Sequence, residues 1–167
     1  MRILALDCAT KTGWAICERG KIVESGVQEF ALQRGESNGM RFLRFTRWLA
    51  GMADPACVPP PLRIDLIAFE AAHHRGGAAT EICVGMTTRA QELAANIKAE
   101  CLPVHTGRLK KWATGNGAAS KDAMIREASK RWDDWGVENP ILDDNHADAI
   151  LLALYAWSEV GHDPAEV

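Results

Sequence analysis

The feature that most constrains the fold of this chain is its opening apolar run, RILALD, at residues 2–7. A strand of this composition has no polar face, so both of its faces must be covered by other parts of the chain. A second run, IDLIAFE at residues 64–70, repeats the pattern, and each run ends on a carboxylate, Asp7 and Glu70. The pair predicts the centre of a sheet that is covered on both sides.

The remaining periodicities predict an α/β protein with a mixed five-stranded sheet and helices on both faces. Residues 13–17 and 21–30 are typical of a hairpin that turns around Gly20. Apolar residues at 42, 45, 48, 49 and 52 have a helical spacing. The other expected elements are a strand at 101–105 and helices at 78–99, 106–113, 121–132 and 145–159. The predicted order is β-β-β-α-β-α-β-α-α-α, within one domain over residues 1–167, and Ser120 is expected to cap the helix that follows it.

The net charge of −3 conceals an uneven distribution along the chain. Residues from 133 onward carry nine Asp and Glu and no Lys or Arg, which leaves 19 basic and 13 acidic residues before them. Seven of the basic residues lie between positions 108 and 131. A basic body beside an acidic cluster suits a nucleic-acid enzyme that holds a divalent metal, although a solvated helix face explains the charge equally well.

Membrane and disulfide classes are not expected. The first apolar run is too short for a signal peptide, and the run AILLALYAW is too short to cross a bilayer. The five cysteines form no CxxC pair, so we expect reduced thiols that serve as small core residues.

Acidic side chains are predicted to gather at one edge of the sheet. Asp7 and Glu70 end their strands, and ligands of open α/β sheets bind beyond the carboxyl ends of the strands. If the two strands are parallel neighbours, both carboxylates face one crevice, and Asp148 near the start of the last helix can join them. Converging carboxylates repel unless a cation lies among them, and oxygen ligands suit Mg²⁺ or Mn²⁺. Two such ions about 4 Å apart are a device for displacement at phosphorus.

Each carboxylate also has a simpler explanation, and the identity of a fourth ligand stays open. Asp7 is also typical of a turn, and Asp148 of a first-turn acid that favours the helix dipole. Asp144 and Asn145 share a helix face with Asp148, whereas His146 points away. Asp143 or Asp144 is the expected N-cap of this helix. The side-chain oxygen of an N-cap accepts hydrogen bonds from backbone amides and is then not available to a metal.

Four stretches, in order, resemble the RuvC family of Holliday-junction resolvases, particularly the small RuvC-like endonucleases of phages and prophages, which have the RNase H-like fold. They are ILALDCATKTGWA, LIAFE, KKWATGNGAASK and NHADAILLALYA. The resemblance implies that Asp7, Glu70 and Asp148 are catalytic metal ligands for Mg²⁺, with Mn²⁺ as a substitute and two ions per site. Lys110 and Lys121 match the two family lysines that contact DNA near the scissile phosphate.

The resemblance also implies a homodimer that cuts four-way DNA junctions symmetrically, with the helix at 78–99 in the interface, in the cytoplasm of a bacterial or phage-infected cell. The family places Asp or His where this chain has Asn145, so Asp144 substitutes for it or metal binding is looser there. His73, His74 and Arg75 fall in a loop that approaches the junction in this family.

Three alternatives remain open. The LDCATKTGWA stretch also resembles the phosphate loop of actin-like ATPases and sugar kinases, but those need a second domain and a second glycine-rich motif. A related nuclease for other branched DNA or for structured RNA fits the same motifs. A junction-binding module without chemistry fits the weaker ligand Asn145.

Overall fold

The structure is a computed structural model that describes residues 1–71, 77–133, 141 and 143–160. Its elements follow the predicted order, with one short 3₁₀ helix, η1, added in the proline-rich segment. They are β1 (Arg2–Asp7), β2 (Lys11–Glu18), β3 (Lys21–Glu29), α1 (Asn38–Ala53), η1 (Pro60–Leu62), β4 (Leu66–Glu70), α2 (Ala78–Ile97), β5 (Glu100–Val104), α3 (Thr106–Thr114), α4 (Lys121–Asp133) and α5 (Asp144–Val160).

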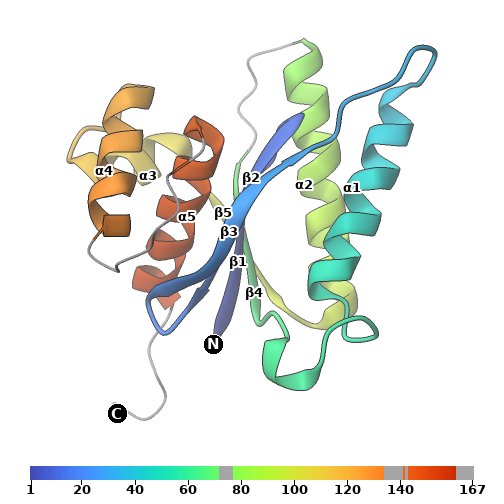
Figure 1. Ribbon diagram of the computed structural model, residues 1–167, viewed down its shortest axis with the longest axis horizontal. Coiled ribbons are helices and arrows are strands. Elements are labelled where there is room, and N and C mark those ends of the chain that lie inside the picture. The colour runs from blue at the N-terminus through green and yellow to red at the C-terminus, as the bar shows by residue number, and fades with distance from the viewer. Residues whose placement is uncertain (72–76, 134–140, 142, 161–167) are drawn as a thin grey trace.

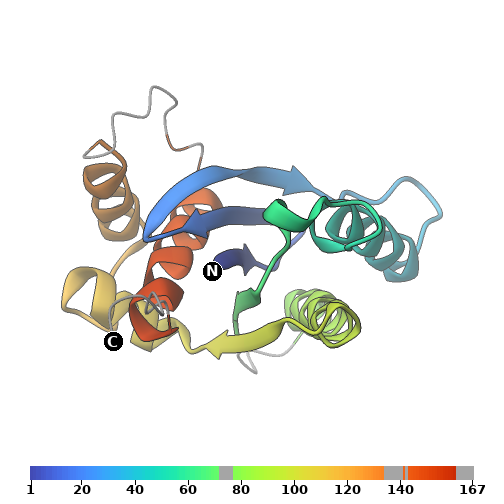
Figure 2. The same ribbon diagram turned by 90° about the horizontal axis from the view of Figure 1, so that it is seen from below.

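The five strands form one sheet in the order β3-β2-β1-β4-β5. The β1–β2 and β2–β3 pairs are antiparallel, whereas β1–β4 and β4–β5 are parallel. Helices α1 and α2 cover one face, and α3, α4 and α5 lie on the other (Figures 1 and 2). The predicted mixed sheet between two helical layers is therefore confirmed, and so is the parallel pairing of the two apolar strands.

Side chains of β1 alternate between two hydrophobic clusters, one on each face of the sheet. Ile3 and Ala5 pack with α5, whereas Leu4 and Leu6 pack with α1 and α2. Residues 2–6 of the strand are buried because each face is covered by a helical layer, as the apolar sequence predicts. Since side chains alternate in direction, Asp7 shares the α5 face with Ile3 and Ala5.

Helix α5 lies against the middle of the sheet, and its residues from His146 to Ala156 are buried apart from Asp148. Its N-terminal backbone comes unusually close to β2. A Cβ atom on Gly13 would lie 1.9 Å from the carbonyl oxygen of Asn145, so only glycine permits this approach. The residue paired with Gly13 across the β1–β2 ladder is Asp7.

Two further predictions concern the cap of α4 and the burial of the cysteines. Ser120 caps α4 as predicted, since its Oγ accepts a hydrogen bond from the amide of Ala123 at 3.3 Å. The prediction that the cysteines are core residues is confirmed for Cys8 and Cys17, which are buried, and Cys83 is half-buried against the core. It is wrong for Cys57 and Cys101, which are exposed. Among the described residues, no helix is both long and apolar enough to span a membrane.

Candidate active site

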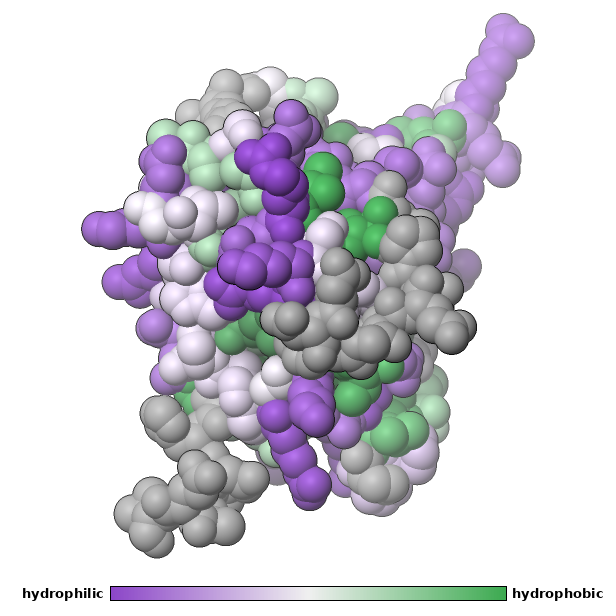
Figure 3. Space-filling model, turned by 60° about the vertical axis from the view of Figure 1, so that its left-hand side comes forward, coloured by the Kyte–Doolittle hydropathy of each residue, from purple (hydrophilic) through white to green (hydrophobic). Residues whose placement is uncertain are grey.

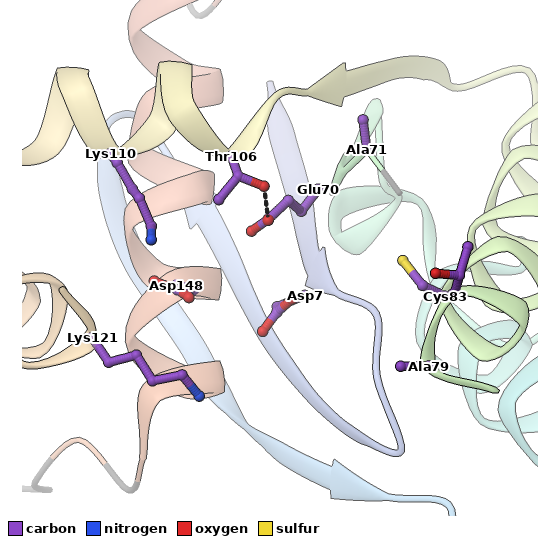
Figure 4. A pocket seen from close by; sticks show the side chains of 10 residues that line it. Asp7, Glu70, Ala71, Ala79, Cys83, Thr106, Lys110, Lys121 and Asp148 are labelled. Atoms are coloured by element: carbon purple, nitrogen blue, oxygen red, sulfur yellow. Dashed lines mark hydrogen bonds between the residues drawn. The ribbon is translucent and has the colours of Figure 1, made fainter. Parts of the chain in front are cut away.

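Asp7, Glu70 and Asp148 line one open pocket of about 250 Å³, together with Lys110 and Lys121 (Figure 4). The three carboxylates face a common space, with the two lysines on the α5 side of it (Figure 4). Residues 7, 70, 110, 121 and 148 come from five different elements, so the pocket exists only in the folded chain. The structure thus brings together five of the residues that the sequence singled out.

The register of the parallel strands explains why Asp7 and Glu70 meet. Leu6 of β1 pairs with Phe69 of β4, and the two carboxylates are the next residue of each strand. Glu70 has the same parity as Leu66 and Ala68, which pack on the α5 face. Both acids therefore emerge at the same strand ends and on the same side of the sheet as α5.

Asp148 reaches the pocket because the start of α5 is fixed in three ways. Asp143 is the N-cap: its Oδ1 accepts a hydrogen bond of 3.0 Å from the amide of His146. The His146 ring is buried, and its Nε2 lies 2.9 Å from Ser25 Oγ on β3. Gly13 completes the fit by allowing the helix to approach the sheet. The choice between Asp143 and Asp144 as cap is settled in favour of Asp143.

Burial and mutual repulsion disfavour the charged forms of two of the three acids. Burial raises the pKa of Asp7 well above its usual range, and the nearby charges of Glu70 and Asp148 raise it further. Burial, followed by the charge of Glu70, raises the pKa of Asp148 to about 7. Asp148 Oδ1 is buried and has no hydrogen-bond partner in the part of the chain that the structure describes. A bound cation would stabilise the ionised forms of these acids and would give the unpartnered Asp148 oxygen a binding partner.

The two lysines lie at the mouth of the pocket and come from α3 and α4. Lys121 is the first residue of α4 and forms an ion pair with Asp144. The hydrogen bond between them raises the pKa of Lys121 and lowers that of Asp144. Asp144 is therefore occupied by Lys121, and neither Asp144 nor Asn145 is among the residues that line the pocket. The fourth-ligand predictions for Asp144 and Asn145 stay predictions.

The carboxylate oxygens of the pocket are donor atoms that suit a hard divalent ion. Within the described ranges, no three Asp, Glu, His or Cys side chains are already gathered closely enough to hold an ion. The three pocket carboxylates nevertheless supply only oxygen donors, and one of those oxygens is buried and unpartnered. Oxygen donors of this kind match Mg²⁺ or Mn²⁺.

Sequence reasoning missed three polar side chains that line the pocket, Thr80, Cys83 and Thr106. The sequence did carry a signal for Thr106, because it stands four residues before Lys110 on a predicted helix and so shares its face. Cys83 faces the pocket from α2, and burial together with the acids raises its pKa to about 11, so it stays a neutral thiol. The predicted DNA-contacting residues His73, His74 and Arg75 lie outside the described residues.

Comparisons with known proteins support the fold. No family model matches the sequence, and no curated protein matches it either. Among solved structures, the Thermus thermophilus RuvC structure has a TM-score of 0.72 at 16% identity, covering 96% of this chain and 97% of its own. T. thermophilus RuvC in complex with Holliday junction substrate gives the same TM-score and identity, over 95% and 96% of the two chains. The fowlpox virus Holliday junction resolvase has a TM-score of 0.54 at 14% identity, covering 96% of this chain and 99% of its own. The chain therefore has the RuvC-type, RNase H-like fold.

Proposed function

We propose that this protein is a metal-dependent endonuclease that resolves four-way DNA junctions by hydrolysing phosphodiester bonds. The observation that carries the proposal is the convergence of Asp7, Glu70 and Asp148 in one pocket with Lys110 and Lys121. Clustered acids whose pKa values are raised by burial and by one another are typical of functional sites rather than of stabilising cores. The likeness of the fold to RuvC, which has been solved with Holliday junction substrate, favours junctions as the substrate.

The roles follow from the positions of the residues. Asp7, Glu70 and Asp148 would hold Mg²⁺, or Mn²⁺ in its place, as two ions per site. Such ions supply an activated water and neutralise the leaving oxygen. Lys110 and Lys121 neutralise the scissile phosphate and its developing charge from the α5 side of the pocket. The expected products carry a 5′-phosphate and a 3′-hydroxyl.

Phosphate contacts extend beyond the pocket along α3 and α4. The basic side chains of this segment include five that are exposed: Arg108, Lys111, Lys121, Arg126 and Lys130. Figure 3, which turns the side of the molecule that carries these helices toward the viewer, shows hydrophilic side chains over much of that surface. DNA bound here, and to His73, His74 and Arg75, would release counterions, so affinity should fall steeply with salt.

Symmetric cutting of a junction requires two pockets related by a twofold axis, so we propose a homodimer. The interface is proposed to include α2, which begins beside the pocket and exposes Val84. An isologous contact through this helix would place one pocket on each side of the axis.

The experiment incubates the protein with a labelled four-way junction or a matched linear duplex, in Mg²⁺, Mn²⁺ or EDTA. Paired symmetric nicks on the junction alone, in either metal and not in EDTA, are expected. Cleavage of duplex and junction alike, or of structured RNA in preference to both, would replace the substrate assignment. An Asn145→Asp variant run beside the parent tests whether a fourth carboxylate strengthens metal use.

A second candidate function is junction binding without chemistry. The ion pair between Asp144 and Lys121 favours this function. In that pair a proposed metal ligand and a proposed catalytic lysine bind each other instead of an ion and a phosphate. Binding of the junction without cleavage under any divalent ion would establish this role and remove the enzymatic one.

A further inference from the structure

Glu70 accepts a hydrogen bond from the hydroxyl group of Thr106, a residue without a role in the proposed reaction. Thr106 Oγ1 donates a hydrogen bond to Glu70 Oε1 across the wall of the pocket (Figure 4). The contact follows from topology, because β4 and β5 are parallel and Glu70 pairs with Val104 at the end of β5. The chain enters α3 two residues later, so the first helical residue lies beside the glutamate.

The backbone around Thr106 is well fixed. The amide of Ala71 donates to the carbonyl of Val104 at 2.8 Å, which ties the ends of β4 and β5 together. His105 caps α3, since its Nδ1 accepts a hydrogen bond of 3.1 Å from the amide of Gly107. Further along α3, Leu109 and Ala113 are buried against α5. The hydroxyl is therefore presented from a rigid element rather than from a loose loop.

One face of α3 thus supplies two different groups to the pocket. Thr106 and Lys110 are four residues apart, and both line it. The hydroxyl contacts the carboxylate of Glu70, whereas the ammonium group of Lys110 acts electrostatically on Asp148 and is proposed to contact a phosphate. Movement of α3 would displace both groups together.

The hydrogen bond has a clear chemical consequence for a metal ligand. A glutamate side chain has several rotatable bonds, and fixing them in a ligating geometry costs conformational entropy. A donor on Oε1 selects one orientation and leaves the second oxygen, Oε2, for an ion. Outer partners that orient a ligand commonly change metal affinity by about tenfold to a hundredfold.

We propose that Thr106 is a positioning residue that orients Glu70 for metal binding, an inference that rests on the proposed function. The hydroxyl acts through Glu70 and does not touch the ion or the DNA. Loss of the hydroxyl should therefore weaken metal binding while leaving metal-free junction binding unchanged.

The test measures Mn²⁺ binding to the purified protein by electron paramagnetic resonance of the free ion. Thr106→Val keeps the shape and removes the hydroxyl, and it should raise the Mn²⁺ dissociation constant about tenfold or more. Thr106→Ser restores a donor and should bring the constant back close to that of the parent. Thr46→Val, on the exposed side of α1, makes the same chemical change away from the pocket and should change nothing.

A double-mutant cycle separates positioning from general destabilisation. In a Glu70→Ala background, Thr106→Val should cause no further loss of Mn²⁺ affinity, because its target is gone. A further loss of similar size there, or failure of Thr106→Ser to restore binding, would overturn the proposal. If the parent binds Mn²⁺ and cuts junctions but Thr106→Val binds as tightly, this inference alone fails. If the parent binds no Mn²⁺, both it and the proposed function fail.

Discussion

The two ends of the central strands differ in how their charged side chains are paired. At the amino end, the nearly buried Arg2 forms ion pairs with Glu18 and Glu24, and its amide donates to Asp65 at 2.6 Å. At the carboxyl end, Asp7 and Asp148 are half-buried beside Glu70 with their pKa values raised, and Asp148 Oδ1 has no hydrogen-bond partner among the described residues. The amino end pairs most of its charge, although Arg2 Nε is buried without a hydrogen-bond partner among the described residues. At the carboxyl end the carboxylates repel one another, and a bound cation would relieve that repulsion.

Replacing Asp7 should have the largest effect on activity. Asp7→Asn keeps the size of the side chain but removes a charged ligand, so junction cleavage should fall by about three orders of magnitude or more. The rate is measured on a labelled junction under single-turnover conditions. Cleavage at the parent rate would show that Asp7 is only a strand-end residue and would remove the functional half of the comparison.

Gly13→Ala should disturb the carboxyl end without touching any acid. The new methyl group would collide with the Asn145 carbonyl and push the start of α5 from the sheet, at a cost of about 1–3 kcal/mol in unfolding free energy. Chemical denaturation measures that cost, and cleavage should fall with it because Asp148 moves.

Gly51→Ala is the matched control for this change. Gly51 lies in α1 with nothing within 4 Å of the added Cβ, so alanine should stabilise the helix by up to about 1 kcal/mol. Equal losses in the two variants would mean that the close approach of α5 is not what positions the site.

The pH dependence of stability should distinguish the two ends in metal-free protein. In the folded chain the pKa of Asp148 is raised to about 7, against an ordinary value of 3.8. Between these two pH values the folded chain therefore binds more protons than the unfolded chain. Its contribution to the free energy of unfolding is full below pH 4 and is lost as the pH rises through 7. Asp148→Asn should flatten this slope in urea melts at stepped pH, whereas an unchanged slope would contradict the raised pKa.

Glu18→Gln should have the smallest effect and affect only stability. It weakens the pairing of Arg2 at a half-exposed position, so the free energy of unfolding should fall by about 1 kcal/mol. Cleavage should stay at the parent level. A loss of cleavage would show that the amino end contributes to function and would break the comparison.

The sequence predicted which residues meet at the carboxyl end of the sheet, but not the contacts that their side chains make there. The apolar runs that end on Asp7 and Glu70 predicted two buried strands, and parallel pairing then brought the acids together. The order of all ten predicted elements is confirmed. What periodicity does not encode is which polar side chains contact one another across elements. The Asp144–Lys121 pair, the Thr106–Glu70 contact and the exposure of Cys101 all depend on tertiary placement.

The most direct test of the central claim is thermal unfolding at pH 7 with and without Mg²⁺, for the parent and for Asp7→Asn. If uncompensated carboxylates await an ion, Mg²⁺ raises the melting temperature of the parent. Metal-free Asp7→Asn should melt above the metal-free parent, because a carboxyl group that burial and its acidic neighbours disfavour is gone, and it should respond little to Mg²⁺. A parent that ignores Mg²⁺, or an Asp7→Asn variant that responds equally, would contradict the account.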